Sequence, residues 1–223
     1  MAEKYGTIPK KFTKAWWEYF WMYYKFHTIA VVAVVLAIGF TVYQNLTTEK
    51  FDTVLTYAGS NYYSEDVVTK LCQTLSPLCD DLDENSEKSL NFLQYQLSEE
   101  ISDPEYAYAI STKLMLTIAE DEAYIYIMDK GIAERYIGED TSSCAFAPLK
   151  DWLAADISGK ETFSAHGLDY GIELSDCKLL NDIGADFSGQ YLFIRYYPRE
   201  DRIKQQLEGY KSAIALANKI LTE

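Results

Sequence analysis

The feature that most constrains this chain is an uninterrupted apolar segment near its N-terminus. No Asp, Glu, Lys or Arg lies between Lys25 and Glu49, a stretch of 23 residues. As a helix, this stretch is about 35 Å long, and the hydrocarbon core of a bilayer is about 30 Å thick. A helix on the core of a soluble domain has polar residues every three or four positions, and this stretch does not. The pattern therefore predicts a transmembrane helix over residues 28–46.

A cleaved signal peptide is the alternative interpretation of this segment. Ala37 and Gly39 have the spacing of a cleavage site, but they lie inside the apolar run. The charged and aromatic lead-in of 27 residues is much longer than the usual charged region of a signal peptide. We therefore expect an anchor that remains in the mature protein.

An aromatic block precedes the apolar run. Trp and Tyr rings favour the headgroup level of a membrane, where their apolar body and polar tip are both accommodated. We expect a helix over residues 11–25 that continues into the span, although the rings would equally suit packing on a membrane protein. The candidate interface residues are Trp16, Trp17, Tyr19, Trp21, Tyr23 and Tyr24.

Charge is distributed unevenly along the chain. Residues 1–44 hold five Lys and two acidic residues, a net of +3, and residues 45–223 have a net charge of −17. Because basic residues before a span favour the inner side, residues 1–27 are expected to be cytoplasmic or interfacial and residues 47–223 extracytoplasmic. The acidic part would repel nucleic acid and anionic membrane surfaces.

Residues after the span alternate between strand-like and helix-like patterns, which predicts a layered α/β domain with a mostly parallel sheet. An Asp-Pro pair at Asp103 marks one helix start. The expected strands are 52–58, 89–97, 123–128, 171–174 and 190–196, and the expected helices are 65–75, a helix after Asp103, 132–137, 149–155, 177–183 and 199–221.

Ligands of such sheets bind beyond the carboxyl ends of the strands. Tyrosines, a serine, an asparagine and an aspartate follow the predicted strands at these ends. The candidate ligand-binding residues are Tyr57, Ser60, Asn61, Tyr62, Tyr63, Asp129 and Tyr197. Core packing is the alternative explanation for the tyrosines, since the chain has 19 of them.

Three segments carry a resemblance to a known family: LTYAGSNYY (residues 55–63), KLMLTIAEDEAYIYIMDKGIAERYI (113–137) and FAPLKDWL (146–153). Together they resemble the first lobe of bacterial extracellular solute-binding proteins of the type II periplasmic-binding fold. The chain also resembles short membrane-anchored proteins of Gram-positive bacteria with one such lobe. The resemblance implies half a cleft, because the chain lacks the length for a second lobe that closes by a hinge. An open edge of this kind suits a peptide, a glycan or another protein.

Patterns for catalysis or metal binding are weak. His27 and His166 are the two histidines, so no histidine-based metal or nucleophile set can be assembled. Ser175 and Lys178 match S-x-x-K without its partner motifs. The loop from Asp81 to Glu87 resembles the start of a calcium loop but lacks the central glycine and the final acid, so we interpret it as a solvated acidic loop. We predict no enzyme activity, metal or cofactor.

Four cysteines, Cys72, Cys79, Cys144 and Cys177, follow the span. An even number in an oxidising compartment indicates two disulfides, and we favour Cys72–Cys79 with Cys144–Cys177. Free buried thiols are the alternative.

These observations favour an accessory or sensor module that is anchored by one helix and presents its domain to a membrane or envelope partner. A tethered receptor for a peptide, glycan or cationic solute is the alternative, and a cell-envelope enzyme is the third. The sequence does not identify a small-molecule ligand.

Overall fold

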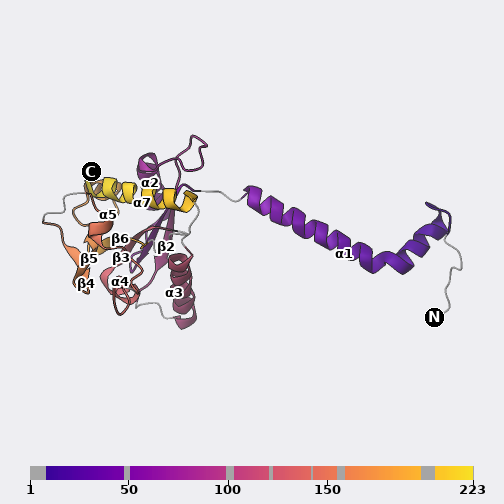
Figure 1. The fold of residues 1–223 in the computed structure, drawn as a ribbon, viewed down its shortest axis with the longest axis horizontal. Helices are drawn as coiled ribbons and strands as arrows, with labels where there is room; N and C mark the ends of the chain where they lie inside the picture. Colours follow the sequence, from indigo (N-terminus) through magenta and orange to yellow (C-terminus); the bar gives the residue numbers. More distant parts are fainter. Residues whose placement is uncertain are drawn as a thin grey trace. The chain divides into compact units, whose positions relative to one another are not determined.

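The computed structural model describes residues 9–47, 51–98, 103–120, 123–141, 143–154, 159–196 and 204–222. It divides into two compact units, Met1–Lys50 and Phe51–Glu223. The first unit is helical, and the second contains a sheet with helices on both faces (Figure 1).

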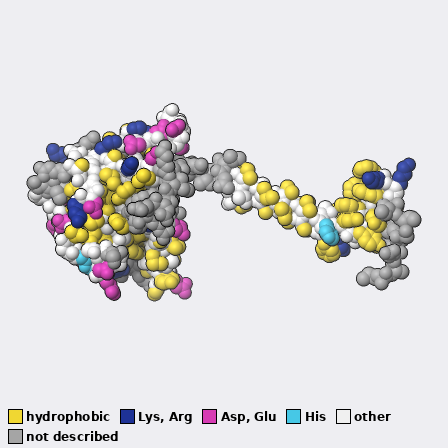
Figure 2. Space-filling model, viewed as in Figure 1, with side chains coloured by type: hydrophobic (Ala, Val, Ile, Leu, Met, Phe, Trp, Pro, Cys, Tyr) yellow, Lys and Arg dark blue, Asp and Glu magenta, His cyan; other side chains and the backbone are white. Residues whose placement is uncertain are grey.

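The first unit is built on one long helix, α1 (Lys14–Thr47). It includes the segment from Lys14 to Gln44, whose most apolar window has a mean hydropathy of 2.1 and no buried residue. The helix is therefore long and apolar enough to cross a membrane, and the predicted aromatic helix and the predicted span form one continuous element. Figure 2 shows apolar side chains along this helix.

The aromatic block of α1 forms a chain of ring contacts along the helix. The rings of Trp16 and Phe20 stack with centroids 5.5 Å apart, and those of Phe20 and Tyr24 stack at 5.7 Å. Trp17 and Trp21 nevertheless expose about half of their surface, 49% and 51%. Half-exposed amphipathic rings of this kind suit a boundary between apolar and polar surroundings.

The second unit is built on a six-stranded sheet with the order β2-β1-β3-β6-β5-β4. β1 pairs in parallel with β2 and with β3, whereas the β3–β6, β6–β5 and β5–β4 pairs are antiparallel. The strands are β1 (Thr53–Gly59), β2 (Leu90–Gln96), β3 (Ile125–Asp129), β4 (Thr162–Ala165), β5 (Leu168–Glu173) and β6 (Gln190–Ile194).

The sheet is therefore mixed, and the prediction of a mostly parallel sheet was wrong. Runs such as those of β3 and β6 are apolar on both faces, and this pattern reveals burial but not direction. β6 enters antiparallel beside β3, and the hairpin of β4 and β5 extends that half of the sheet. The hairpin turns at His166 and Gly167, whose φ angles are +50° and +77°, as a two-residue primed turn requires.

Strand β4 was not predicted from the sequence. Its four residues have the burial order half-buried, buried, exposed and half-buried, which is too short and irregular for an alternating signal. Its register with β5 also shifts: Phe163 pairs with Gly171 and the next residue pairs with Asp169, which leaves Tyr170 as the extra residue of a β-bulge.

Helices cover both faces of the sheet. α2, α5, α6 and α7 pack on the face of Leu55 and Ile127, and α3 and α4 pack on the face of Tyr126 and Phe193. The helices are α2 (Glu65–Leu75), α3 (Pro104–Ala119), α4 (Lys130–Tyr136), α5 (Leu149–Trp152), α6 (Lys178–Ile183) and α7 (Lys204–Thr222), with a short 3₁₀ turn, η1 (Ser76–Leu78), after α2.

The start of α3 shows why the sequence predicted it well. The Asp103 carboxylate accepts hydrogen bonds from the amides of Glu105 and Tyr106, and Pro104 occupies the first turn, where no amide donor is needed. For α2, Ser64 stands at the cap position in an extended conformation, but its side chain makes no capping bond.

Candidate functional site

The candidate ligand-binding residues gather at the carboxyl ends of β1 and β3, where the chain turns from Gly59 to Tyr63. Asp129 ends β3, and its Oδ2 accepts hydrogen bonds from both the amide and the hydroxyl of Ser60, each at 2.7 Å. The two strands are neighbours in the sheet, so their ends meet here as the parallel arrangement requires. The Asp129 carboxylate therefore fixes the first residue of the turn.

Gly59 is required at this turn by close packing. A Cβ atom at Gly59 would lie 2.0 Å from the hydroxyl oxygen of Tyr57 and 2.7 Å from Oδ1 of Asp129. Both groups therefore lie directly over the Gly59 backbone. Because glycine has no Cβ, the backbone at Gly59 can lie against the side chains of Tyr57 and Asp129, which any larger residue would displace.

Two of the candidate tyrosines form the floor of the turn. Tyr57 is fully buried and its hydroxyl oxygen accepts hydrogen bonds from the amide of Asn61 and from Nε2 of Gln190, each at 3.0 Å. The Tyr63 hydroxyl donates to the carbonyl of Asp186 at 2.8 Å. Burial, reinforced by the negative charge of Asp129, raises the pKa of Tyr57, so this phenol stays neutral. Core packing, the alternative explanation for the tyrosines, fits these two.

Tyr62 differs from its neighbours because 68% of its surface is exposed. It lies at an open hollow of about 420 Å³ together with Asn61, Val67 and Asp186. Hydrogen bonds from the hydroxyl and amide of Ser188 lower the pKa of Asp186, which keeps this exposed carboxylate charged. The hollow thus offers an aromatic face and a negative charge, and Tyr197, the last candidate, lies outside the described residues.

The sequence interpretation missed three polar residues of this site, Gln94, Gln190 and Asp186. Oε1 of Gln94 accepts a hydrogen bond from the Tyr63 amide at 2.8 Å, which ties the turn to β2. Gln190 begins β6, and its position beside Tyr57 depends on the antiparallel insertion of that strand. A glutamine at a strand end carries no sequence signal of its own, so only the sheet order could have revealed it.

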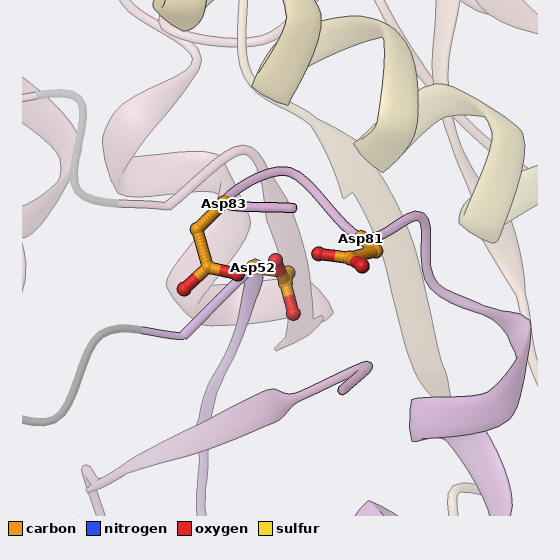
Figure 3. Close-up of side chains that lie close together, drawn as sticks. All are labelled: Asp52, Asp81 and Asp83. Carbon is orange, nitrogen blue, oxygen red and sulfur yellow. The ribbon is translucent and has the colours of Figure 1, made fainter. Parts of the chain in front are cut away.

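Three carboxylates form a second cluster at the other end of β1. Figure 3 shows Asp52, before β1, beside Asp81 and Asp83 of the loop between η1 and β2. One carboxylate oxygen of each residue lies within 4.8 Å of the others. Backbone amides already occupy these carboxylates: Asp52 accepts from Leu82 at 2.7 Å and from Ser89 at 2.8 Å. Burial alone would raise the pKa of Asp52, but these bonds hold it below its usual value.

The acidic loop is organised in the same manner by its own amides. Asp81 accepts hydrogen bonds from the amides of Asn85 and Ser86, and Asp83 accepts from the Asn85 side chain at 2.8 Å. This arrangement explains the cluster as a brace for the loop between η1 and β2. The charges are stabilised by oriented N–H groups.

No disulfide forms among the four cysteines, and the predicted pairs were wrong. Cys144 belongs to the core on one face of the sheet and Cys177 to the core on the other, so the sheet separates them. The thiol of Cys177 instead donates to the carbonyl of Ile220 at 2.9 Å, and that of Cys79 donates to Leu75. Burial raises the pKa of all four thiols.

No protein-family model, curated protein or solved structure matches the chain. The geometry of the turn, the hollow and the apolar helix therefore carries the functional interpretation.

Proposed function

We propose that this protein is a single-pass membrane-anchored interaction module. Its α/β domain lies outside the cytoplasm and makes the interaction. The observation that carries the proposal is α1, whose most apolar window has a mean hydropathy of 2.1 and no buried residue. A helix of this length with an exposed apolar surface is stable in lipid and unfavourable in water. The five lysines that precede the span support a cytoplasmic N-terminus.

Within this proposal, the domain serves as an accessory or sensor subunit for a membrane or envelope partner. The site at the ends of β1 and β3 supports binding rather than catalysis, since its polar groups are engaged in positioning the turn. The likeness to one lobe of a solute-binding protein belongs to the same proposal. The Tyr62 hollow is open, as half of a cleft would be.

A tethered receptor is the second candidate function, favoured by the pairing of exposed Tyr62 with the charged Asp186 carboxylate. An aromatic face beside a carboxylate suits a cationic group, through stacking and charge attraction. The net charge of −17 on residues 45–223 would also concentrate cationic ligands at low salt.

Extraction of cell membranes at high pH tests the anchor. The full-length protein is expected to remain in the membrane pellet after an alkaline carbonate wash. Protease added to intact cells is expected to digest the C-terminal domain and to spare a tag at the N-terminus. Release into the supernatant, or digestion of the N-terminal tag alone, would overturn the proposed anchoring or its orientation.

Crosslinking in intact cells, followed by purification in mild detergent, separates the two functions. A stoichiometric membrane partner supports the accessory subunit. A monomer without a partner would contradict it and favour the receptor, whose hollow would then be tested with cationic probes against a Tyr62→Ala variant.

A further inference from the structure

Strand β2 lies at one edge of the sheet, and its register shows which backbone groups face outward. The Thr53 amide donates to the Ser89 carbonyl, and the Leu97 amide donates to the Gly59 carbonyl. In a parallel ladder alternate residues face the neighbouring strand, so the odd-numbered residues of this segment face β1. The N–H and C=O groups of Leu90, Phe92, Gln94 and Gln96 therefore point away from the sheet.

These outward groups are mostly unoccupied within the described part of the chain. The backbone of Phe92 forms a hydrogen bond with the Cys72 thiol of α2. Burial raises the pKa of this thiol, and the bond from Phe92 partly opposes that increase. Among described residues, no backbone partner joins Leu90, Gln94 or Gln96 on that side. Leu90 and Phe92 are nevertheless buried, with 4% and 8% of their surface exposed. The outward groups open to another strand are therefore those of Gln94 and Gln96, which are partly exposed.

The two edges of the sheet are built differently. β4, at the other edge, has four residues and lies opposite a β-bulge, and both features discourage the addition of a strand. β2 has seven residues, LNFLQYQ, without a charge, a proline or a register shift. It therefore lacks the charge, the proline and the bulge by which many natural edge strands discourage pairing.

Acidic segments flank β2 on both sides in the sequence. Residues 80–88 contain five acidic residues and one lysine, a net of −4, and residues 98–105 contain four acidic residues and no basic one. Figure 2 shows acidic side chains at several places on the second unit. Two copies pairing through β2 would bring like charges together, which disfavours self-association. A partner segment with basic residues at its ends would instead meet opposite charge.

We propose that the β2 edge, at its Gln94 and Gln96 end, binds an extended, basic-flanked segment of another protein as a seventh strand of the sheet. Backbone hydrogen bonds supply the affinity, and the acidic flanks select the partner and exclude a second copy. This inference deepens the proposed function, on which it rests for the biological role of an interaction module. The binding itself requires no membrane.

A synthetic peptide tests the inference on the full-length protein in detergent micelles. The probe is a fluorescent Lys-Lys-Thr-Val-Thr-Val-Thr-Val-Lys-Lys peptide, whose binding is measured by anisotropy. Two control peptides carry N-methyl groups on alternate amides, one peptide for each edge of the strand. A third control peptide has Glu in place of every Lys. The N-methylated peptide that loses the pairing amides should bind at least about tenfold more weakly, because several hydrogen bonds are lost. The Glu peptide should bind more weakly at low salt, and this difference should shrink at high salt.

The Cys72 thiol gives an independent reading of where the peptide binds. It is partly exposed beside the edge, whereas the other three thiols are buried. Bound peptide should slow alkylation of Cys72 by iodoacetamide, as followed by intact mass. Unchanged alkylation with tight peptide binding would place the peptide elsewhere and overturn the assignment to β2.

A variant of the edge completes the test. Gln96→Pro removes one outward N–H, and proline is tolerated at a strand edge that faces solvent. Its matched control, Gln96→Thr, retains the N–H and should bind like the unmodified protein. Equal peptide affinity for both variants, with both folded by circular dichroism, would contradict strand addition. If the peptide binds but carbonate releases the protein from membranes, strand addition at β2 is supported and the proposed anchoring is wrong. If the protein stays in the membrane pellet but does not bind the peptide, only the proposed strand addition is wrong.

Discussion

The same apolar residue types have opposite surroundings in the two units. In α1, Val34 and Ile38 expose 58% and 59% of their surface, whereas Ile125 and Ile127 of β3 expose none. The charges are also opposite, +3 over residues 1–44 and −17 over the rest. The difference teaches that apolar content alone does not define a core: periodicity, strand or helix context and flanking charge decide whether apolar side chains meet lipid or one another.

Charges placed in the span should have the largest effect on this comparison. The double substitution Val34→Arg and Ile38→Arg should cost about 5 to 7 kcal/mol of insertion free energy, from about 3 kcal/mol per arginine near the helix centre. Most of the protein should then leave the carbonate-washed membrane pellet. Val34→Leu with Ile38→Leu is the matched control and should stay in the pellet. Retention of the arginine variant would contradict a membrane span.

A cavity in the domain tests the other side of the comparison. Ile127→Ala should lower the free energy of unfolding by about 2 to 5 kcal/mol, because a fully buried side chain is shortened within packed surroundings. Urea denaturation of the domain within the full-length protein, followed by circular dichroism, measures this loss. Val31→Ala, at a position that is 62% exposed, should leave the same transition unchanged. Equal losses for the two variants would erase the distinction between the units.

Removal of the Asp129 carboxylate should have an intermediate effect. Asp129→Ala deletes the acceptor of two hydrogen bonds from Ser60 and should cost about 1 to 3 kcal/mol of domain stability. The neighbouring Lys130→Ala, at an exposed residue, is the control in the same urea titration. A stable Asp129→Ala protein would show that the Gly59–Tyr63 turn does not depend on this carboxylate.

The acid sensitivity of Asp52 should be the smallest effect. Its pKa is lowered in the folded domain from the usual 3.8, so the ionised group contributes stability above about pH 4, and this contribution is lost as pH falls through the lower folded value. Asp52→Asn should cost about 1 kcal/mol at neutral pH, since the group is partly exposed. The difference from the unmodified protein should narrow between pH 4 and pH 2. A constant difference over this range would exclude linkage through Asp52.

The sequence predicted the elements better than their arrangement. Helices α2 and α3 were readable because local signals mark them, the apolar spacing of α2 and the Asp103-Pro104 start of α3. Strand directions were not, because the apolar runs of β3 and β6 look alike whichever way they run. β4 left no alternating signal, since its four residues sit against a bulge.

The candidate site was partly accessible from the sequence for the same reason. Ser60 and Asp129 come together because β1 and β3 are parallel neighbours, which the strand–helix alternation between them indicates. Gln190 enters only through the antiparallel β6, so the sequence did not point to it. The disulfides were mispredicted because cysteine number and compartment do not reveal that a sheet lies between Cys144 and Cys177.

The unpaired thiols have a consequence for how the domain is made. Its core is packed without a covalent crosslink, so folding needs no oxidase or disulfide isomerase. The domain is therefore expected to reach the same fold under reducing and under oxidising conditions.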